Sequence, residues 1–353
     1  MYGFGSPLPL CVKHATFVNE IHSPLYKGAR IVPTTVDRPQ FSAPELQIRS
    51  VDYGFFGPGS PTWKVWTAPT AAIGFQRAVA LEHFDPALTA AVADLGGIYD
   101  DPFGRLDHTF AYFLIAAVGD SQMAIEASEH LMAVHAKSTG IDPVTGRRYS
   151  ANNPDSQLWI HVTGWHSVLK CFEMYGPGPL SPDEEARYWE ECVIAAQLQT
   201  CKGSGVPASR AEVREYFEQV RPSLCVSERA RRGMHYLLFT PYSKGARLWL
   251  GAHLMAPAAI STLPRWMREL GGFELPWGLE VVYRPLVRAA VAAAASHPEA
   301  LSAGLRQTIG PMTGKLYHQH ITVSPPSTPS VVTVEDARKR YGRLGRGQSS
   351  SAS

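Results

Sequence analysis

Residues 101–117 read DPFGRLDHTFAYFLIAA, and this stretch predicts the helix on which the interpretation of the whole chain depends. The Asp-Pro pair at its start can supply the N-cap and the first helical residue. Arg105, His108 and Thr109 follow at positions i, i+3 and i+4, so they share one helical face. The apolar residues after them predict a largely buried helix, where a cation, an imidazole and a hydroxyl are costly unless they are satisfied. An anionic ligand group near Arg105 would satisfy the cation, and an ion pair between Arg105 and a nearby aspartate is the alternative.

Capping residues and prolines recur along the chain and predict a mostly helical protein. Helix starts are indicated by Asp85-Pro86, Asn153-Pro154, the capping box Ser181-Pro182-Asp183-Glu184 and the same spacing at Ser209-Arg210-Ala211-Glu212. Gly96-Gly97 ends the first of these helices, and an alanine-rich helix over 286–305 is expected to break near His297-Pro298. Strand alternation with hairpin turns is nearly absent, so we expect an all-α fold.

The composition divides the chain into three regions. Residues 1–70 are rich in Gly, Pro and aromatic residues without sustained periodicity, and we expect an irregular N-terminal arm packed on the core. Residues 71–320 carry the helical pattern and form the main domain. Residues 321–353 are predicted to be a disordered tail. This tail has five basic against two acidic residues, which allows weak contact with an acidic partner or a membrane surface, although a solvated terminus is the simpler interpretation.

The overall composition excludes several classes of protein. The 353 residues carry a formal net charge of +2, which argues against a protein built to bind nucleic acid. The five cysteines include no C-x-x-C pair, which argues against a disulfide framework and against a cysteine-rich zinc site. The chain begins without a secretory signal and has no run of 18 apolar residues, so we predict a cytoplasmic protein without a transmembrane segment. Phosphate-binding loops, dinucleotide-binding motifs and nucleophile elbows are also absent.

Histidine is the unusual feature of the composition, with 13 residues, because its side chain ligates metals and haem iron. His130 and His135 belong to a helix predicted over 120–139, and His161 and His166 belong to the next predicted helix. Each pair is five residues apart, about 140° around a helix, so at most one member of a pair can face a cofactor. Taken singly, each of these histidines is more often a hydrogen-bonded structural residue than an iron ligand.

Five pieces of sequence follow one another in a recognisable order. They are Asp101-Pro102-x-Gly104-Arg105-x-x-x-Thr109, Val134-His135-x-x-x-x-Gly140, Tyr149-Ser150-Ala151-Asn152-Asn153-Pro154, Leu158-Trp159-Ile160-His161-Val162-Thr163, and Val206-Pro207-Ala208-Ser209 leading to Tyr216-Phe217. That order resembles the MpaB-like oxygenase family, which includes the rubber oxygenases known as latex clearing proteins. The resemblance covers roughly residues 71–310.

The resemblance implies a globin-like helical core around a b-type haem, with a histidine as the axial ligand of the iron. By its place in the motifs His135 would be that ligand, while Arg105 and Thr109 would lie close to the haem and Arg105 would suit a propionate. His161 matches a further histidine of the family, which is either close to the haem or structural. Rubber oxygenases carry a lysine where this chain has His108, whose imidazole could ligate the iron, hydrogen-bond O₂ or move protons to a peroxide.

The function that follows from the resemblance is that of a haem-b-dependent oxygenase or oxidase. Its substrate would be a small apolar molecule or a secondary metabolite, with O₂ or peroxide as the oxidant. Cleavage of an extracellular polymer is not expected, because the secretion signal and the lysine are both missing. Two alternatives stay open. One is a haem-binding sensor or carrier without turnover, in which His135 and His108 both ligate the iron, and the other is a helical protein that has lost the cofactor and binds a partner or lipid.

Overall fold

The computed structural model describes residues 51–95, 97–201, 205–273, 275–276, 278–322, 326 and 328–343. Most of these residues are helical, which confirms the predicted all-α fold. Strands in the described part of the chain are limited to β1 (Thr139–Ile141) and β2 (Arg148–Ser150), which pair antiparallel in a short hairpin. The α-helices are α1 (Pro61–Trp66), α2 (Thr70–Glu82), α3 (Pro86–Leu95), α4 (Gly97–Asp100), α5 (Pro102–Val118), α6 (Ser121–His135), α7 (Pro154–Tyr175), α8 (Pro182–Ala196), α9 (Arg210–Val220), α10 (Glu228–Leu238), α11 (Ala246–Ser261), α12 (Arg265–Gly271), α13 (Leu279–Ala295), α14 (Pro298–Thr308), α15 (Pro311–Thr322) and α16 (Val334–Tyr341).

Local sequence determines where many of these helices begin. The Asp101 side chain accepts a hydrogen bond from the amide of Gly104 at 2.9 Å, as its place before Pro102 predicts. Ser181 starts α8 with a complete capping box. The alanine-rich helix breaks between α13 and α14, where His297 precedes a proline. These predicted helix boundaries are confirmed.

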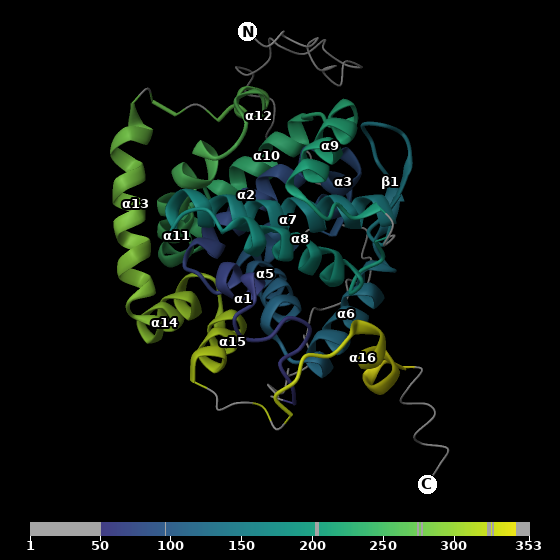
Figure 1. Cartoon of the computed structure of the whole chain (residues 1–353). Helices are drawn as coiled ribbons and strands as arrows, with labels where there is room; N and C mark the ends of the chain where they lie inside the picture. Colours follow the sequence, from purple (N-terminus) through teal and green to yellow (C-terminus); the bar gives the residue numbers. More distant parts are fainter. Residues whose placement is uncertain are drawn as a thin grey trace, which may run out of the picture.

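Helices α2 and α7 lie at the centre of the fold and pack closely against each other (Figure 1). Helices α10 and α11 cover α2, and α8 packs on α7. Gly74 of α2 faces Val168 of α7, and a Cβ atom at Gly74 would lie only 2.6 Å from the Val168 Cα. A residue without a side chain therefore allows the two backbones to approach this closely.

We expect Gly74→Ala to lower the free energy of unfolding by about 1–3 kcal/mol, because the new methyl group must displace the backbone of α7. Gly164→Ala in α7 is the matched control, since a Cβ atom there meets the ring of Phe113 at an ordinary 3.4 Å, and alanine favours the helix. Urea denaturation of both variants measures the difference. Equal stability of the two variants would contradict the close packing of α2 on α7.

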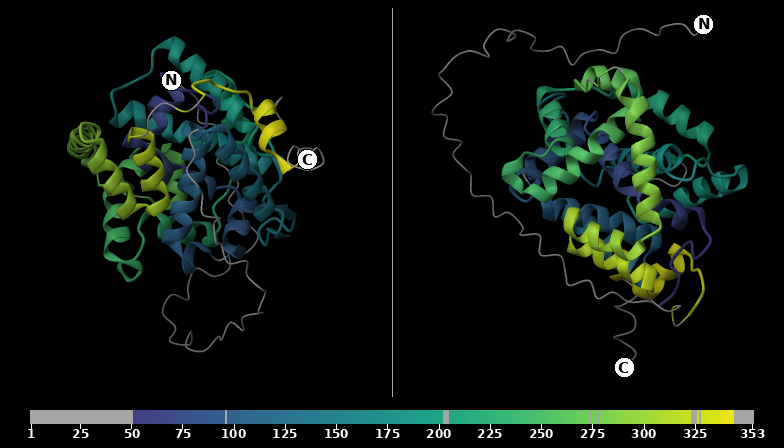
Figure 2. Two further views of the ribbon diagram at one scale, coloured as in Figure 1. Left: turned by 90° about the horizontal axis from the view of Figure 1, so that it is seen from below. Right: turned by 90° about the vertical axis from the view of Figure 1, so that its left-hand side faces the viewer.

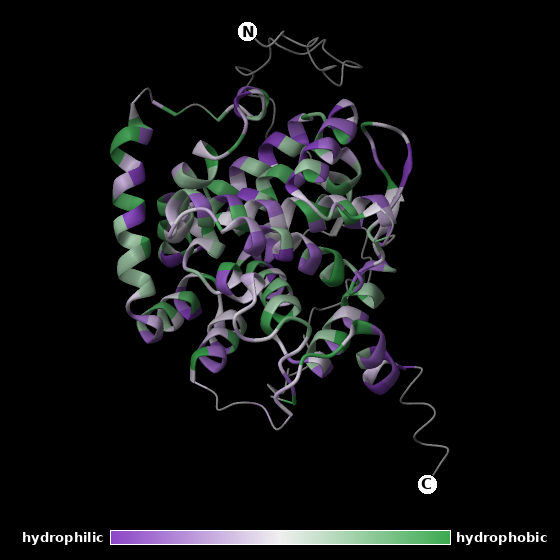
Figure 3. Cartoon of the chain, in the orientation of Figure 1, coloured by the Kyte–Doolittle hydropathy of each residue, from purple (hydrophilic) through white to green (hydrophobic). Residues whose placement is uncertain are grey.

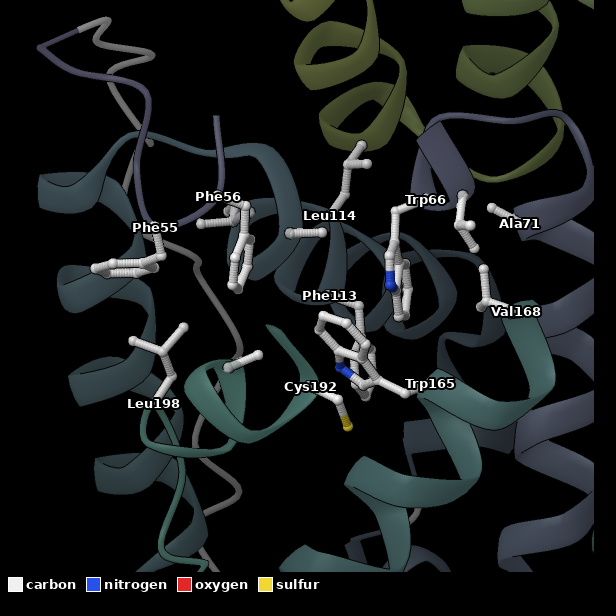
Figure 4. Close-up of a cluster of buried hydrophobic side chains, with 14 of the residues drawn as sticks. Phe55, Phe56, Trp66, Ala71, Phe113, Leu114, Trp165, Val168, Cys192 and Leu198 are labelled. Carbon is white, nitrogen blue, oxygen red and sulfur yellow. The ribbon is translucent and has the colours of Figure 1, made fainter. Parts of the chain in front are cut away.

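A cluster of aromatic rings fills the core between α1, α5, α7 and α8 (Figure 4). The Trp165 ring centroid lies 5.7 Å from that of Trp66 and 5.0 Å from that of Tyr188, in tilted and edge-on geometries. The Trp66 ring also stacks on Phe113 of α5 at 5.7 Å. Such geometries add a specific stabilisation to the burial of the rings, so the cluster fixes α5 relative to α7.

The segment before α1 lies against the start of α6. The Asp52 carboxylate accepts hydrogen bonds from the amide of Ser121 at 2.8 Å and from its hydroxyl at 2.5 Å. Phe55 and Phe56 are buried in the aromatic cluster. Residues 1–50 of the predicted arm lie outside the described residues.

The C-terminal segment corrects the prediction of a disordered tail over 321–353. Thr333 caps α16, and Val334 and Ala337 are buried where this helix packs on α6. The Ser- and Pro-rich composition predicted disorder, but a prediction from composition does not take account of single buried side chains. Here two apolar residues at helical spacing are enough to dock a short capped helix. Residues 344–353 of the predicted tail lie outside the described residues.

Asp107 connects α5 to the C-terminal helices. It lies between Arg105 and His108 in sequence, and its carboxylate is buried. The carboxylate accepts hydrogen bonds from the amides of Met312 at 2.9 Å and Thr313 at 2.8 Å, in the first turn of α15. The first amides of a helix have no partner within it, so Asp107 satisfies two of them from another helix.

Exposed apolar side chains gather on α13, and α11 also carries exposed Leu250 and Leu254. Helix α13 lies at the edge of the molecule and carries the exposed side chains Val281, Val282 and Leu286 (Figures 2 and 3). Across the described residues, no helix combines the length and apolar character that a membrane crossing requires.

Four cysteines lie within the described residues. Cys171, Cys192 and Cys201 are free thiols, and the first two are buried. Cys225 is disulfide-bonded, which the number and spacing of the cysteines did not predict.

Candidate functional site

A cavity of about 140 Å³ is lined by residues of α3, α5, α6 and α7, and we refer to it as the first cavity. Arg105, His108 and Thr109 of α5 and His135 of α6 all line it. The structure therefore brings four of the residues singled out in the sequence to one place. Most of the remaining wall is apolar and includes Leu88, Val92, Phe113, Leu131, Val134 and Ile160.

His135 is the last residue of α6 and is half-buried at the cavity wall. Burial lowers the pKa of His135 to about 4, with a smaller contribution from the positive charge of Arg105. The ring is therefore neutral at pH 7 and keeps a nitrogen lone pair. The side-chain nitrogen of Gln157 in α7 lies 3.3 Å from Nδ1 of His135 and donates a hydrogen bond to the carbonyl of Ala151 at 2.6 Å. Gln157, which the sequence did not single out, thus links α7 to the ring.

The β1–β2 hairpin after α6 leads into the cavity wall through Ser150 at the end of β2. A Cβ atom at Gly140 would lie 2.7 Å from the hydroxyl oxygen of Tyr149, so a glycine is needed for Tyr149 to pack across the hairpin. Asn152 donates a hydrogen bond to the carbonyl of Met132 at 2.8 Å, close to the end of α6. These contacts hold the segment after β2 against the end of α6, and Ala151 of this segment lines the cavity.

Glu82 is the acidic group of the site, and the sequence did not single it out. It is the last residue of α2 and lines the first cavity together with Arg105. Burial raises the pKa of Glu82 to about 8, and the positive charge of Arg105 offsets only part of this effect. Burial also lowers the pKa of Arg105, against the influence of Glu82. The signal available in the sequence was an acidic residue at the end of a mostly apolar helix.

Two further hydroxyl groups belong to α5. Thr109 donates its hydroxyl to the carbonyl oxygen of Arg105 at 2.8 Å, one helical turn earlier, so this hydroxyl is already satisfied within the helix. The hydroxyl of Tyr112 is buried close to Gln199, but within the described part of the chain it makes no hydrogen bond of normal geometry. Tyr112 and Gln199 both line the first cavity. An unsatisfied hydroxyl at the wall favours a polar ligand group there.

His161 does not line the first cavity. Its ring is buried in α7, and its Nε2 lies 2.8 Å from the carbonyl oxygen of Cys192 in α8. Because a carbonyl only accepts, the ring donates this bond and ties α7 to α8. Burial lowers the pKa of His161 to about 4. His130 and His166 are also absent from the lining of the first cavity.

A second cavity of about 130 Å³ adjoins the first, since Glu82, Val92, Arg105 and Thr109 line both. The rest of its wall comes mainly from α2, α5, α10, α11 and the end of α14. This wall is also largely apolar and includes Phe75, Val79, Leu106, Leu248, Met255 and Ile309. The sequence did not predict this second space.

We expect the stability of the protein to depend on the ionisation of Glu82. The folded carboxyl keeps its proton up to about pH 8, while the unfolded carboxyl releases it near its ordinary value of 4.5. The folded state therefore loses stability as the pH rises between these values. Relative to Glu82→Gln, the wild-type free energy of unfolding should fall by about 1 kcal/mol per pH unit from pH 5 to pH 8. If the free energy of unfolding, measured by urea denaturation, changes with pH in the same way in both proteins, the raised pKa of Glu82 is contradicted.

Comparison with known proteins identifies a family whose matched region contains the residues of the first cavity. The profile of the family described as "ER-bound oxygenase mpaB/B'/Rubber oxygenase, catalytic domain" matches residues 63–295, well over half of the chain. The matched range contains Glu82, Arg105, His108, Thr109 and His135. No curated protein and no solved structure gives a significant match to the chain.

Proposed function

We propose that this chain, which belongs to the ER-bound oxygenase mpaB/B' and rubber oxygenase family, is an oxygenase that depends on haem b. The substrate would be a small apolar molecule or a secondary metabolite, and the oxidant O₂ or peroxide. The observation that carries this proposal is the meeting of Arg105, His108, Thr109 and His135 in one cavity with a mostly apolar wall. A cytoplasmic location stays a prediction.

The donor set of the first cavity fits a haem. Within the described residues, no group of three or more His, Cys, Asp or Glu side chains is placed to hold a bare metal ion. A haem iron needs only one or two protein ligands, because the macrocycle supplies four nitrogens. The neutral imidazole of His135 is suited to that role. A ring that binds metal through Nε2 would carry its proton on Nδ1, the nitrogen beside which the Gln157 side chain lies.

Polar groups of α5 would orient the cofactor. Arg105 would pair with a propionate, as a guanidinium does with carboxylates. The unsatisfied hydroxyl of Tyr112 offers a further donor at the same wall. Thr109 would act through packing, since its hydroxyl already bonds the backbone of its own helix. His161 would support the site indirectly by holding α7 against α8.

Haem, when bound, supplies the activation of O₂ or peroxide, and the chain supplies orientation, proton transfer and the exclusion of water. His108 would hold or move a proton at its imidazole, because it lines the cavity from the same helix as Arg105. Glu82 keeps its proton at pH 7 and can donate it within the site. Above about pH 8 the same group becomes an acceptor.

The visible spectrum of the full chain titrated with haemin tests this proposal. A stoichiometric Soret band with a five-coordinate or weakly six-coordinate signature, responsive to CO, is expected. Because His108 and His135 line the same cavity, a closed bis-histidine site is the alternative, and a six-coordinate spectrum unresponsive to CO would favour a sensor or carrier. A chain that takes up no haem would contradict both functions.

A further inference from the structure

Two side chains in the wall of the second cavity each carry a hydrogen-bond acceptor for which the described residues supply no donor. They belong to Gln76 of α2 and to His83, the C-cap residue that follows α2. The two residues are seven positions apart and therefore lie on one face of the helix. Their side chains are buried, at 6% and 4% exposure. The Oε1 atom of Gln76 and the Nε2 atom of His83 lack a hydrogen-bond partner among the described residues.

The hydrogen bonds made by the other nitrogen atom of each side chain determine which atom remains as an acceptor. The Nε2 atom of Gln76 donates hydrogen bonds to the carbonyls of Leu238 at 3.3 Å and Ala252 at 3.1 Å, which fixes the amide and leaves its oxygen as an acceptor. The Nδ1 atom of His83 lies 2.7 Å from the carbonyl of Val79, which can only accept, so Nδ1 carries the proton. Burial lowers the pKa of His83, so its ring is neutral and Nε2 is a free acceptor.

Buried acceptors without donors are costly, and proteins rarely keep them without a reason. The surrounding wall of Phe75, Val79, Leu106 and Met255 is apolar. The cavity is similar in size to the engineered cavity of about 150 Å³ that binds benzene in another protein. A single-ring apolar group therefore fits the space, and each donor on that group would satisfy one of the two acceptors.

We propose that the second cavity binds an apolar ligand that carries hydroxyl or N–H donors, and that Gln76 and His83 each accept a hydrogen bond from one such donor. The cavity shares Glu82, Arg105 and Thr109 with the first cavity, so a ligand there lies next to the proposed haem site. The proposed oxygenase function is needed only to identify this ligand as the substrate. Binding itself requires no metal.

Binding of two probes of equal shape tests the inference. p-Cresol and p-xylene differ by a hydroxyl in place of a methyl group, and the affinity of each for the full chain can be measured by titration calorimetry, with and without haem. His83→Phe and Gln76→Leu each remove one acceptor. Comparison of the ratio of p-cresol to p-xylene affinity between proteins cancels the solvation of the probes. Because p-cresol has one hydroxyl hydrogen, this ratio should fall at least about fivefold in the variant that lacks the acceptor that this hydrogen uses.

His235→Phe is the matched control, because Nε2 of His235 also bonds a carbonyl, that of Gly271 at 2.8 Å, and the residue lines neither cavity. Its affinity ratio should equal that of the wild type. An unchanged ratio in both acceptor variants, or no binding of either probe to the wild type, would overturn the inference. A changed ratio in a chain that takes up no haem would contradict the proposed oxygenase function alone and leave the ligand site standing.

Discussion

Replacement of His135 by alanine is expected to weaken haem binding by more than about a hundredfold. Loss of a residue that only orients a metal ligand already costs 10- to 100-fold in affinity, and His135→Ala removes the proposed ligand itself. His135 is half-buried at the end of α6, so the fold should survive its truncation. Haemin titration followed by absorbance measures the affinity, and circular dichroism checks the fold.

The control for this experiment is His130→Ala. His130 lies on the same helix five residues earlier and does not line the first cavity. This variant should bind haem as the wild type does. Retention of the wild-type affinity by His135→Ala would contradict its role as the ligand, and loss of haem in His108→Ala would then identify His108 in its place.

The largest effect on stability is expected for Trp165→Ala, which should lower the free energy of unfolding by about 3–5 kcal/mol. The Trp165 side chain is 2% exposed, and its ring contacts Phe56, Trp66 and Tyr188 from three different segments. Truncation would leave a cavity that these rings cannot fill, because each is held by its own contacts. Urea denaturation measures the loss.

Trp249→Ala makes the same substitution at a tryptophan that is 36% exposed on α11. Less area is buried there, so the loss should be no more than about half of that at Trp165. Similar losses at the two positions would contradict the greater contribution expected from the burial and ring contacts of Trp165.

Helix boundaries could be predicted because they depend on local chemistry. A capping side chain and a following proline act within one helical turn, as at Asp101 and Asn153, and need no knowledge of the rest of the fold. Helix α16 was missed because its formation depends on a surface of α6 that the local composition does not reveal. Composition is a weak guide where two buried side chains, Val334 and Ala337, decide the outcome.

The candidate site was predictable to the extent that its residues share one helix. Arg105, His108 and Thr109 follow from helical spacing, whereas the place of His135 beside them came from the order of the motifs. Glu82 could not be found in this way, because its pKa depends on tertiary burial and on Arg105 from another helix. The acceptors of the second cavity are hidden for the same reason, since a missing partner is a property of the folded chain.

The contact of Asp107 with α15 has a consequence for the dynamics of the site. The family match ends at residue 295, yet the amides of Met312 and Thr313 are bonded to a carboxylate that lies between Arg105 and His108. Hydrogen exchange at these two amides requires that their bonds to Asp107 break, so it reports the local separation of α15 from α5. A ligand that occupies either cavity and holds α5 in place should therefore slow deuterium uptake at Met312 and Thr313.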